Sequence, residues 1–227
     1  MNCGLLPLDR WLLRNRKGAL RLAAALAAFV PICWIVIQVN GSFPGDRILI
    51  SWMEHPDPSE PFAWIANEFS LLGTGLPSCV SVAVAWVLVD RYLGRRYAML
   101  ILASVSVVAL NEILKRAVGP TPLELKVFGE DVAPNYPSGH VVYLTSLCAP
   151  LAWFALARHK RLIFIAMALL TLGMGPFRIV AGAHWPSDLL AGYALALAWT
   201  IVVLVVGLPW AAAGRSREAE ASITARA

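Results

Sequence analysis

Two residues with catalytic potential, His184 and Asp188, lie four positions apart at the start of an expected helix. Pro186 suits the first turn of that helix, because the N–H that proline lacks is not needed there. Residues four apart share a helix face, so the Asp188 carboxylate can hold the His184 imidazole in one tautomer and raise its basicity. A histidine held in this way is suited to act as a nucleophile.

A second polar group, Pro137-Ser138-Gly139-His140, opens another expected helix. The free N–H groups of a helix start, a glycine that allows close approach and a serine hydroxyl form a cradle for an anion at the positive end of the helix dipole. Two positive charges, Lys115 and Arg178, close other apolar runs. These residue types suit a phosphate group, provided that the fold brings them together.

Long apolar runs must supply the helices that position these residues. The chain of 227 residues is 59% hydrophobic and 15% charged, with a mean hydropathy of +0.66. Soluble domains are about 45–50% apolar and about 25% charged, which excludes an ordinary water-soluble enzyme. A membrane span needs roughly 20 residues. The runs cover residues 18–39, 71–89, 97–114, 141–157, 162–177 and 186–208, and they predict an all-α, polytopic membrane protein with a bundle of six transmembrane helices.

The basic residues are divided unequally between the two ends of these spans. Most of the 19 Lys and Arg residues lie at the ends shared with both termini, and cytoplasmic flanks carry such an excess. We therefore expect a multi-pass protein of the plasma membrane with both termini in the cytoplasm. All the polar candidates then meet at the extracytoplasmic surface, where they describe a phosphate site. They are Lys115, Ser138, Gly139, His140, Arg178, His184 and Asp188.

We expect the chain to form a single membrane domain over residues 1–210, followed by a disordered cytoplasmic tail over 211–227. Residues 46–70 mix apolar residues with acids and prolines, and are expected to lie along the membrane surface. The net charge of +5 does not form a basic stripe interleaved with aromatic residues, so no nucleic-acid partner is expected.

The order of these motifs resembles the signature of the type 2 phosphatidic acid phosphatase superfamily, which also contains acid phosphatases and vanadium haloperoxidases. The signature region spans residues 115–188: a lysine, then P-S-G-H at 137–140, then R-x5-H-x3-D from Arg178 to Asp188. The resemblance implies six spans and an extracytoplasmic active site, as in the integral-membrane members of the family.

The resemblance also implies a role for each matching residue. His184 would form a phosphohistidine while Asp188 orients it, and His140 would be the general acid that protonates the leaving group. Neither a metal nor another cofactor is implied, and the sequence gathers no carboxylate cluster of the kind that holds Mg²⁺. The phosphoryl oxygens would be held by Lys115, Ser138, the Gly139 N–H and Arg178.

The first motif of the family, K-x6-R-P, is degenerate in this chain. Counting from Lys115, Pro122 takes the place of the arginine and Leu123 that of the proline. One phosphate-binding cation is therefore missing from its usual place. Arg116 or Lys126 could substitute, although Arg116 follows Lys115 directly and so points about 100° away on a helix.

Three neighbours of the motifs are expected to have structural roles. Phe177 replaces the serine before Arg178, which removes one hydrogen bond and leaves the chemistry intact. Glu112 lies one turn before Lys115 and is expected to neutralise it. Asn111 is expected to make a hydrogen bond between helices.

The implied function is a metal-independent phosphatase that hydrolyses a phosphomonoester or diphosphate of a lipid from the outer leaflet. The resemblance implies substrates such as an isoprenyl diphosphate, phosphatidic acid or phosphatidylglycerol phosphate. Two alternatives stay open: phosphotransfer to a lipid or sugar alcohol, and a degenerate member that binds or moves a phospholipid without cleaving it. Membrane lipids are the expected partners, and the sequence does not indicate an oligomeric state.

Overall fold

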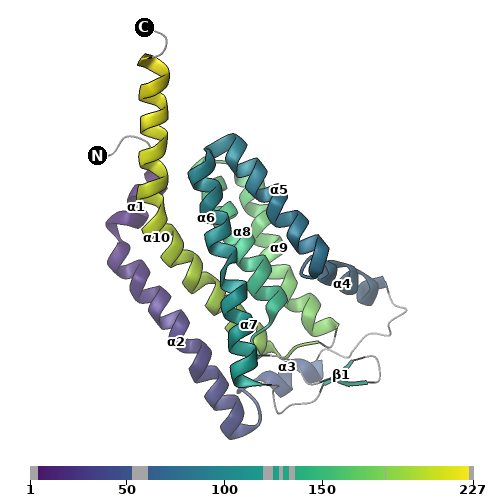
Figure 1. The fold of residues 1–227 in the computed structure, drawn as a ribbon. Helices are drawn as coiled ribbons and strands as arrows, with labels where there is room; N and C mark the ends of the chain where they lie inside the picture. Colours follow the sequence, from purple (N-terminus) through teal and green to yellow (C-terminus); the bar gives the residue numbers. More distant parts are fainter. Residues whose placement is uncertain are drawn as a thin grey trace.

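The computed structural model describes residues 5–52, 61–119, 125–127, 130–132, 136–181 and 183–224. These residues form a helical protein with one short hairpin (Figure 1). The elements before the hairpin are α1 (Pro7–Arg14), α2 (Arg16–Asn40), α3 (Asp46–Trp52), α4 (Pro61–Leu71), α5 (Gly75–Leu93), α6 (Arg95–Val105) and α7 (Val107–Val118). The hairpin pairs β1 (Leu125–Val127) with β2 (Glu130–Val132), and is followed by α8 (Gly139–Ala157), α9 (Arg161–Val180) and α10 (Pro186–Thr224).

The six predicted spans are confirmed. In the part of the chain that the structure describes, six helical segments are long and apolar enough to cross a membrane: α2, α5, α6 with α7, α8, α9 and α10. The third span is divided by a turn at Ser106, whose N–H still bonds to the carbonyl of Leu102. The chain is thus an all-α, multi-pass membrane protein. The two three-residue strands, which the sequence did not predict, lie in the connection between α7 and α8.

Helix α8 lies at the centre of the bundle. It packs against α6, α7, α9 and α10, and 67% of its apolar segment is buried, against 11% for α5. Val141 and Leu144 contribute to a core with α6 and α9, while Val142 joins Cys33 and Ala191 in a second core with α2 and α10. The start of α8, which carries the P-S-G-H motif, is therefore held by helices on several sides.

The candidate residues lie at one end of this bundle. Helices α7 and α9 finish there, while α8 and α10 begin there, beside α3 and the hairpin (Figure 1). Helix α1 and the last turns of α10 lie at the opposite end (Figure 1). The expected surface segment over 46–70 contains α3 and α4, and residues 53–60 lie outside the described part.

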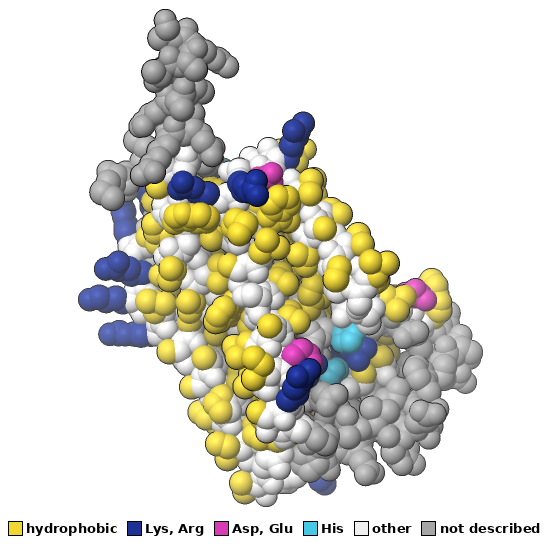
Figure 2. Space-filling model, viewed as in Figure 1, with side chains coloured by type: hydrophobic (Ala, Val, Ile, Leu, Met, Phe, Trp, Pro, Cys, Tyr) yellow, Lys and Arg dark blue, Asp and Glu magenta, His cyan; other side chains and the backbone are white. Residues whose placement is uncertain are grey.

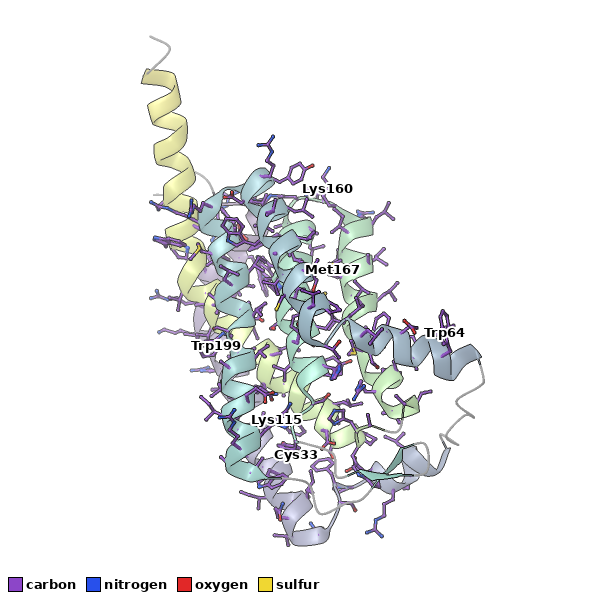
Figure 3. The ribbon with its side chains drawn as sticks, turned by 45° about the vertical axis from the view of Figure 1, so that its right-hand side comes forward. Cys33, Trp64, Lys115, Lys160, Met167 and Trp199 are labelled. Carbon is purple, nitrogen blue, oxygen red and sulfur yellow. The ribbon has the colours of Figure 1, made fainter. Side chains whose placement is uncertain are left out.

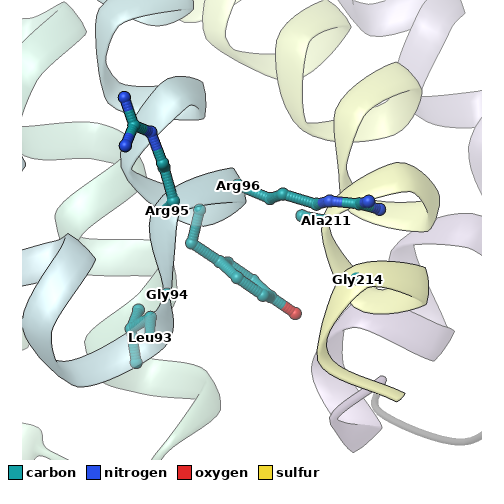
Figure 4. A pocket seen from close by; sticks show the side chains of 7 residues that line it. Leu93, Gly94, Arg95, Arg96, Ala211 and Gly214 are labelled. Atoms are coloured by element: carbon teal, nitrogen blue, oxygen red, sulfur yellow. The ribbon is translucent and has the colours of Figure 1, made fainter. Parts of the chain in front are cut away.

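The disordered tail expected over 211–227 stays a prediction. Helix α10 continues through residue 211 to Thr224, and 225–227 lie outside the described part. Where α10 passes residue 210 it packs on α6: the Arg96 guanidinium lies 5.2 Å from the Trp210 ring and donates to the Trp210 carbonyl at 3.0 Å. Figure 4 shows the small pocket at this contact, between Arg96 and Gly214, at the end away from the candidate residues.

Candidate active site

His184 and Asp188 make the contact that their spacing predicted. Helix α10 begins at Pro186, and the Asp188 carboxylate folds back to accept the N–H of Trp185 at 3.0 Å. The same oxygen, Oδ2, lies 3.3 Å from Nδ1 of His184. Both side chains are buried, with 7% of His184 and none of Asp188 exposed. A carboxylate at Nδ1 holds a proton there, which leaves Nε2 of the ring with its lone pair.

The starts of α8 and α10 are joined directly. The Ser138 N–H donates to the carbonyl of Asp188 at 3.1 Å. Gly192 allows this approach, because a Cβ at that position would lie 3.1 Å from the Ser138 carbonyl and 3.2 Å from Val141. Two helix N-termini, each with N–H groups that lack intrahelical partners, thus open side by side. Their dipoles favour an anion at this point.

Lys115 reaches the start of α8 from the last turn of α7 (Figure 3). A Cβ at Gly139 would lie only 2.7 Å from Nζ of Lys115, so the missing side chain leaves room for the ammonium group. Nζ also pairs with Glu112 at 2.9 Å, as expected. Arg116, by contrast, is exposed, and the side chain of Lys126 lies outside the described part.

The remaining two candidates approach from α8 and α9. His140 packs against the turn between α4 and α5, where a Cβ on Gly73 would lie 2.4 Å from Cδ2 of its ring. Arg178 lies in the last turn of α9, and its Nε is buried without a partner among the described residues.

Burial and the positive charges of Arg178 and Lys115 lower the pKa of His184 well below its ordinary value of 6.5. Histidine, acidic and basic side chains are visible together at this end in Figure 2.

Comparison with known proteins decides the family. The sequence profile of the PAP2 superfamily matches residues 96–210, just over half of the chain. The chain belongs to the PAP2 superfamily. All the candidate residues of this PAP2 chain, from Lys115 to Asp188, fall inside the matched region.

A curated protein and a solved structure, both from Bacillus subtilis, agree with this assignment. The chain is 24% identical over 94 residues to phosphatidylglycerophosphatase B of Bacillus subtilis (strain 168), in a match that covers 39% of this chain and 46% of that protein. The chain thus spans about half the length of that curated relative. Its fold matches the crystal structure of the first transmembrane PAP2 type phosphatidylglycerolphosphate phosphatase from Bacillus subtilis, with a TM-score of 0.66 and 19% identity, over 80% of this chain and 93% of that one.

Sequence reasoning missed the residue that anchors the start of α10 in this PAP2 chain. Asp46, the first residue of α3, accepts the Ser187 N–H at 3.0 Å and the Ser187 hydroxyl at 2.7 Å. Only 2% of Asp46 is exposed, and burial raises the pKa of its carboxyl above 3.8 while the hydrogen bonds from Ser187 oppose this shift. No motif links two residues 141 positions apart, so the sequence offered no signal for this contact.

In this PAP2 chain, Phe177 stands in place of a serine and packs against another aromatic ring. Its ring lies 4.6 Å from that of Phe69, at a tilt of 47°, and so joins α9 to α4 next to Arg178.

Among the described residues, no group of three or more His, Cys, Asp and Glu side chains is arranged to hold a metal ion.

Proposed function

We propose that this chain is an integral-membrane lipid phosphatase that acts through a phosphohistidine on His184. The observation that carries the proposal is the buried contact between His184 and Asp188, at the point where α8 and α10 begin side by side. A nucleophile and an anion cradle at one place are what phosphoryl transfer requires, since this reaction depends mainly on positioning and on stabilising charge.

In the first step, Nε2 of His184 attacks phosphorus and the bond from phosphorus to the lipid oxygen breaks. His140 gives its proton to that leaving oxygen, while Asp188 stabilises the positive charge that develops on the His184 ring. In the second step, water attacks phosphorus, the P–N bond breaks and His140 takes the proton from the water. Inorganic phosphate is then released, and both histidines return to their starting states.

Four groups hold the phosphoryl oxygens during both steps. Lys115 and Arg178 supply positive charge, the Ser138 hydroxyl supplies a hydrogen bond, and the N–H of Gly139, the first residue of α8, supplies another. Two observations support this assignment. Lys115 lies against Gly139, and both the Ser138 Oγ and the Arg178 Nε are buried without partners in the described part of the chain.

The names of the matched proteins favour a substrate class, and the distribution of basic residues favours one orientation of the chain in the membrane. The curated match and the solved structure are both named as phosphatases of phosphatidylglycerophosphate, which makes this lipid the first substrate to test. The connections from α5 to α6 and from α8 to α9 carry a cluster of basic residues. The end of the bundle that holds these connections therefore faces the cytoplasmic side of the plasma membrane. The basic residues are Arg91, Arg95, Arg96, Arg158, Lys160 and Arg161. The active site then faces the outer leaflet, from which a lipid diffuses laterally into it.

The experiment uses the purified full-length protein with a panel of lipid phosphates, with and without EDTA. His184→Asn is compared with His159→Asn, a matched control at the opposite end of the bundle. Asparagine tolerates the positive φ of 60° that His159 adopts. We expect phosphate release that EDTA leaves unchanged, that His184→Asn abolishes and that His159→Asn preserves.

The same assay separates the alternatives. Normal turnover in His184→Asn refutes the phosphohistidine mechanism. Phosphate recovered on an added alcohol, instead of as free phosphate, identifies a phosphotransferase. Tight orthovanadate binding without hydrolysis of any lipid in the panel identifies a member that binds phospholipid without cleaving it.

A further inference from the structure

Asn111 is a buried polar residue that lacks its predicted interhelical hydrogen bond within the described part of the chain. It lies on α7, one turn before Lys115, and none of its surface is exposed. Neither its Nδ2 nor its Oδ1 has a hydrogen-bond partner among the described residues, so the expected bond between helices is not seen. Burying an amide without a partner is costly, and such a group calls for an explanation.

The amide of Asn111 is directed at the candidate active site. A Cβ at Gly139 would lie 3.6 Å from Nδ2 of Asn111 and 2.7 Å from Nζ of Lys115. The two side chains share one face of α7, as their spacing of four residues requires. They therefore meet the first residue of α8 together. Next to it, the buried Ser138 Oγ also has no partner within the described segments.

Lys115 is not the hydrogen-bond partner of the Asn111 amide. Nζ of Lys115 is already paired with Glu112 at 2.9 Å, whereas the structure gives the Asn111 amide no such bond. An oxygen placed against the Gly139 backbone would reach the amide and the ammonium at the same time. A phosphoryl oxygen at the start of α8 meets this description.

We propose that Asn111 is a further phosphate-binding residue, whose Nδ2 donates a hydrogen bond to a phosphoryl oxygen beside Lys115. This inference rests on the proposed function. Pro122 takes the place of an arginine that would bind phosphate. The neutral Asn111 amide on α7 supplies part of the phosphate binding that this arginine would provide. A neutral amide can be buried before substrate arrives at a lower cost than a second unpaired cation. A donor fixed in this way stabilises charge as it develops on the transferred group.

The test replaces Asn111 with leucine, which removes the polar atoms, and with aspartate, which keeps the shape and removes the donor. Thr145→Val is the matched control, because Thr145 is also fully buried with an unpartnered side-chain oxygen. Thr145 lies on α8, roughly 10 Å along the helix from Ser138 at 1.5 Å per residue. Each protein is assayed for turnover of a lipid phosphate and for orthovanadate binding by titration calorimetry, after its folding has been checked by thermal unfolding.

We expect both Asn111 variants to lower kcat by about 100-fold, the effect of removing one donor from an oxyanion site. They should weaken orthovanadate binding by at least about tenfold, which is a separate readout. Thr145→Val should change neither. Wild-type turnover and orthovanadate affinity in Asn111→Asp refute the proposal, even if Asn111→Leu fails to fold. If the wild type binds orthovanadate without hydrolysing lipid, the proposed function fails while the binding comparison still decides the role of Asn111. If the wild type neither binds nor hydrolyses, both proposals fail.

Discussion

Ser187 gives both its backbone N–H and its hydroxyl to the carboxylate of Asp46, at 3.0 and 2.7 Å. Ser187 stands between His184 and Asp188, so this contact fixes the turn that carries the proposed nucleophile. Helix α3, which begins at Asp46, thereby acts as a support for the start of α10.

Replacing Asp46 with alanine should loosen that support. We expect a loss of about 2–4 kcal/mol in the free energy of unfolding, since a hydrogen bond to a charged group contributes about 1.5–3 kcal/mol. Thermal unfolding in detergent measures the change, and Ser187→Ala provides the second arm of a double-mutant cycle. The double variant should be little less stable than Asp46→Ala alone. Independent, additive losses would show that the two residues do not act together.

Replacing Gly73 with alanine should displace the His140 ring, because the new Cβ would lie 2.4 Å from its Cδ2. A displacement of this size can cost about 100-fold in rate. If His140 protonates the leaving group, an alkyl phosphate should lose far more activity than p-nitrophenyl phosphate, whose leaving group needs no proton.

The control for this variant is Gly173→Ala on α9. Its Cβ would meet Phe177 at an ordinary 3.6 Å, and alanine suits a helix interior better than glycine does. Full activity is expected. Equal losses on both phosphate esters in Gly73→Ala would contradict the role given to His140.

Replacing Asp188 with asparagine should reduce kcat by a factor on the order of 10²–10⁴, by comparison with the loss of the carboxylate from a serine protease triad. The reason is that Oδ2 of Asp188 bonds both the Trp185 N–H and the His184 ring, so an amide cannot favour the required tautomer as strongly. Steady-state kinetics should show a nearly unchanged KM. A change confined to KM would assign Asp188 to binding instead.

The pH dependence should follow the lowered pKa of His184. A base with a lowered pKa stays unprotonated to lower pH, so kcat/KM should not begin to fall on the acid side until the pH is below 6.5. Lys115→Met removes one of the positive charges that lower this pKa. The pKa of His184 then rises, and the acid limb moves to higher pH. A wild-type acid limb at or above pH 6.5 contradicts this account.

The features that the sequence predicted correctly are local in the chain. The six spans follow from continuous apolar runs, and the contact of His184 with Asp188 follows from a spacing of four residues. Family membership follows from motifs within residues 115–188, inside the matched region.

The features that it missed depend on packing between distant segments. Asp46 meets Ser187, and Gly73 meets His140, only after the helices have assembled. The same applies to Asn111, whose amide was expected to bond another helix and instead faces the start of α8. The bond from Arg96 on α6 to the Trp210 carbonyl on α10 likewise joins residues 114 positions apart.

The bond between the Ser138 N–H and the Asp188 carbonyl uses main-chain atoms alone. Most point substitutions leave such a bond in place, and among single residues only proline at 138 removes the donor. The spacing between the histidine on α8 and the histidine before α10 is therefore protected against most changes of side chain. Insertions and deletions near either helix start are the changes that threaten it. This protection is one physical route by which two chains with 19% identity can share the fold.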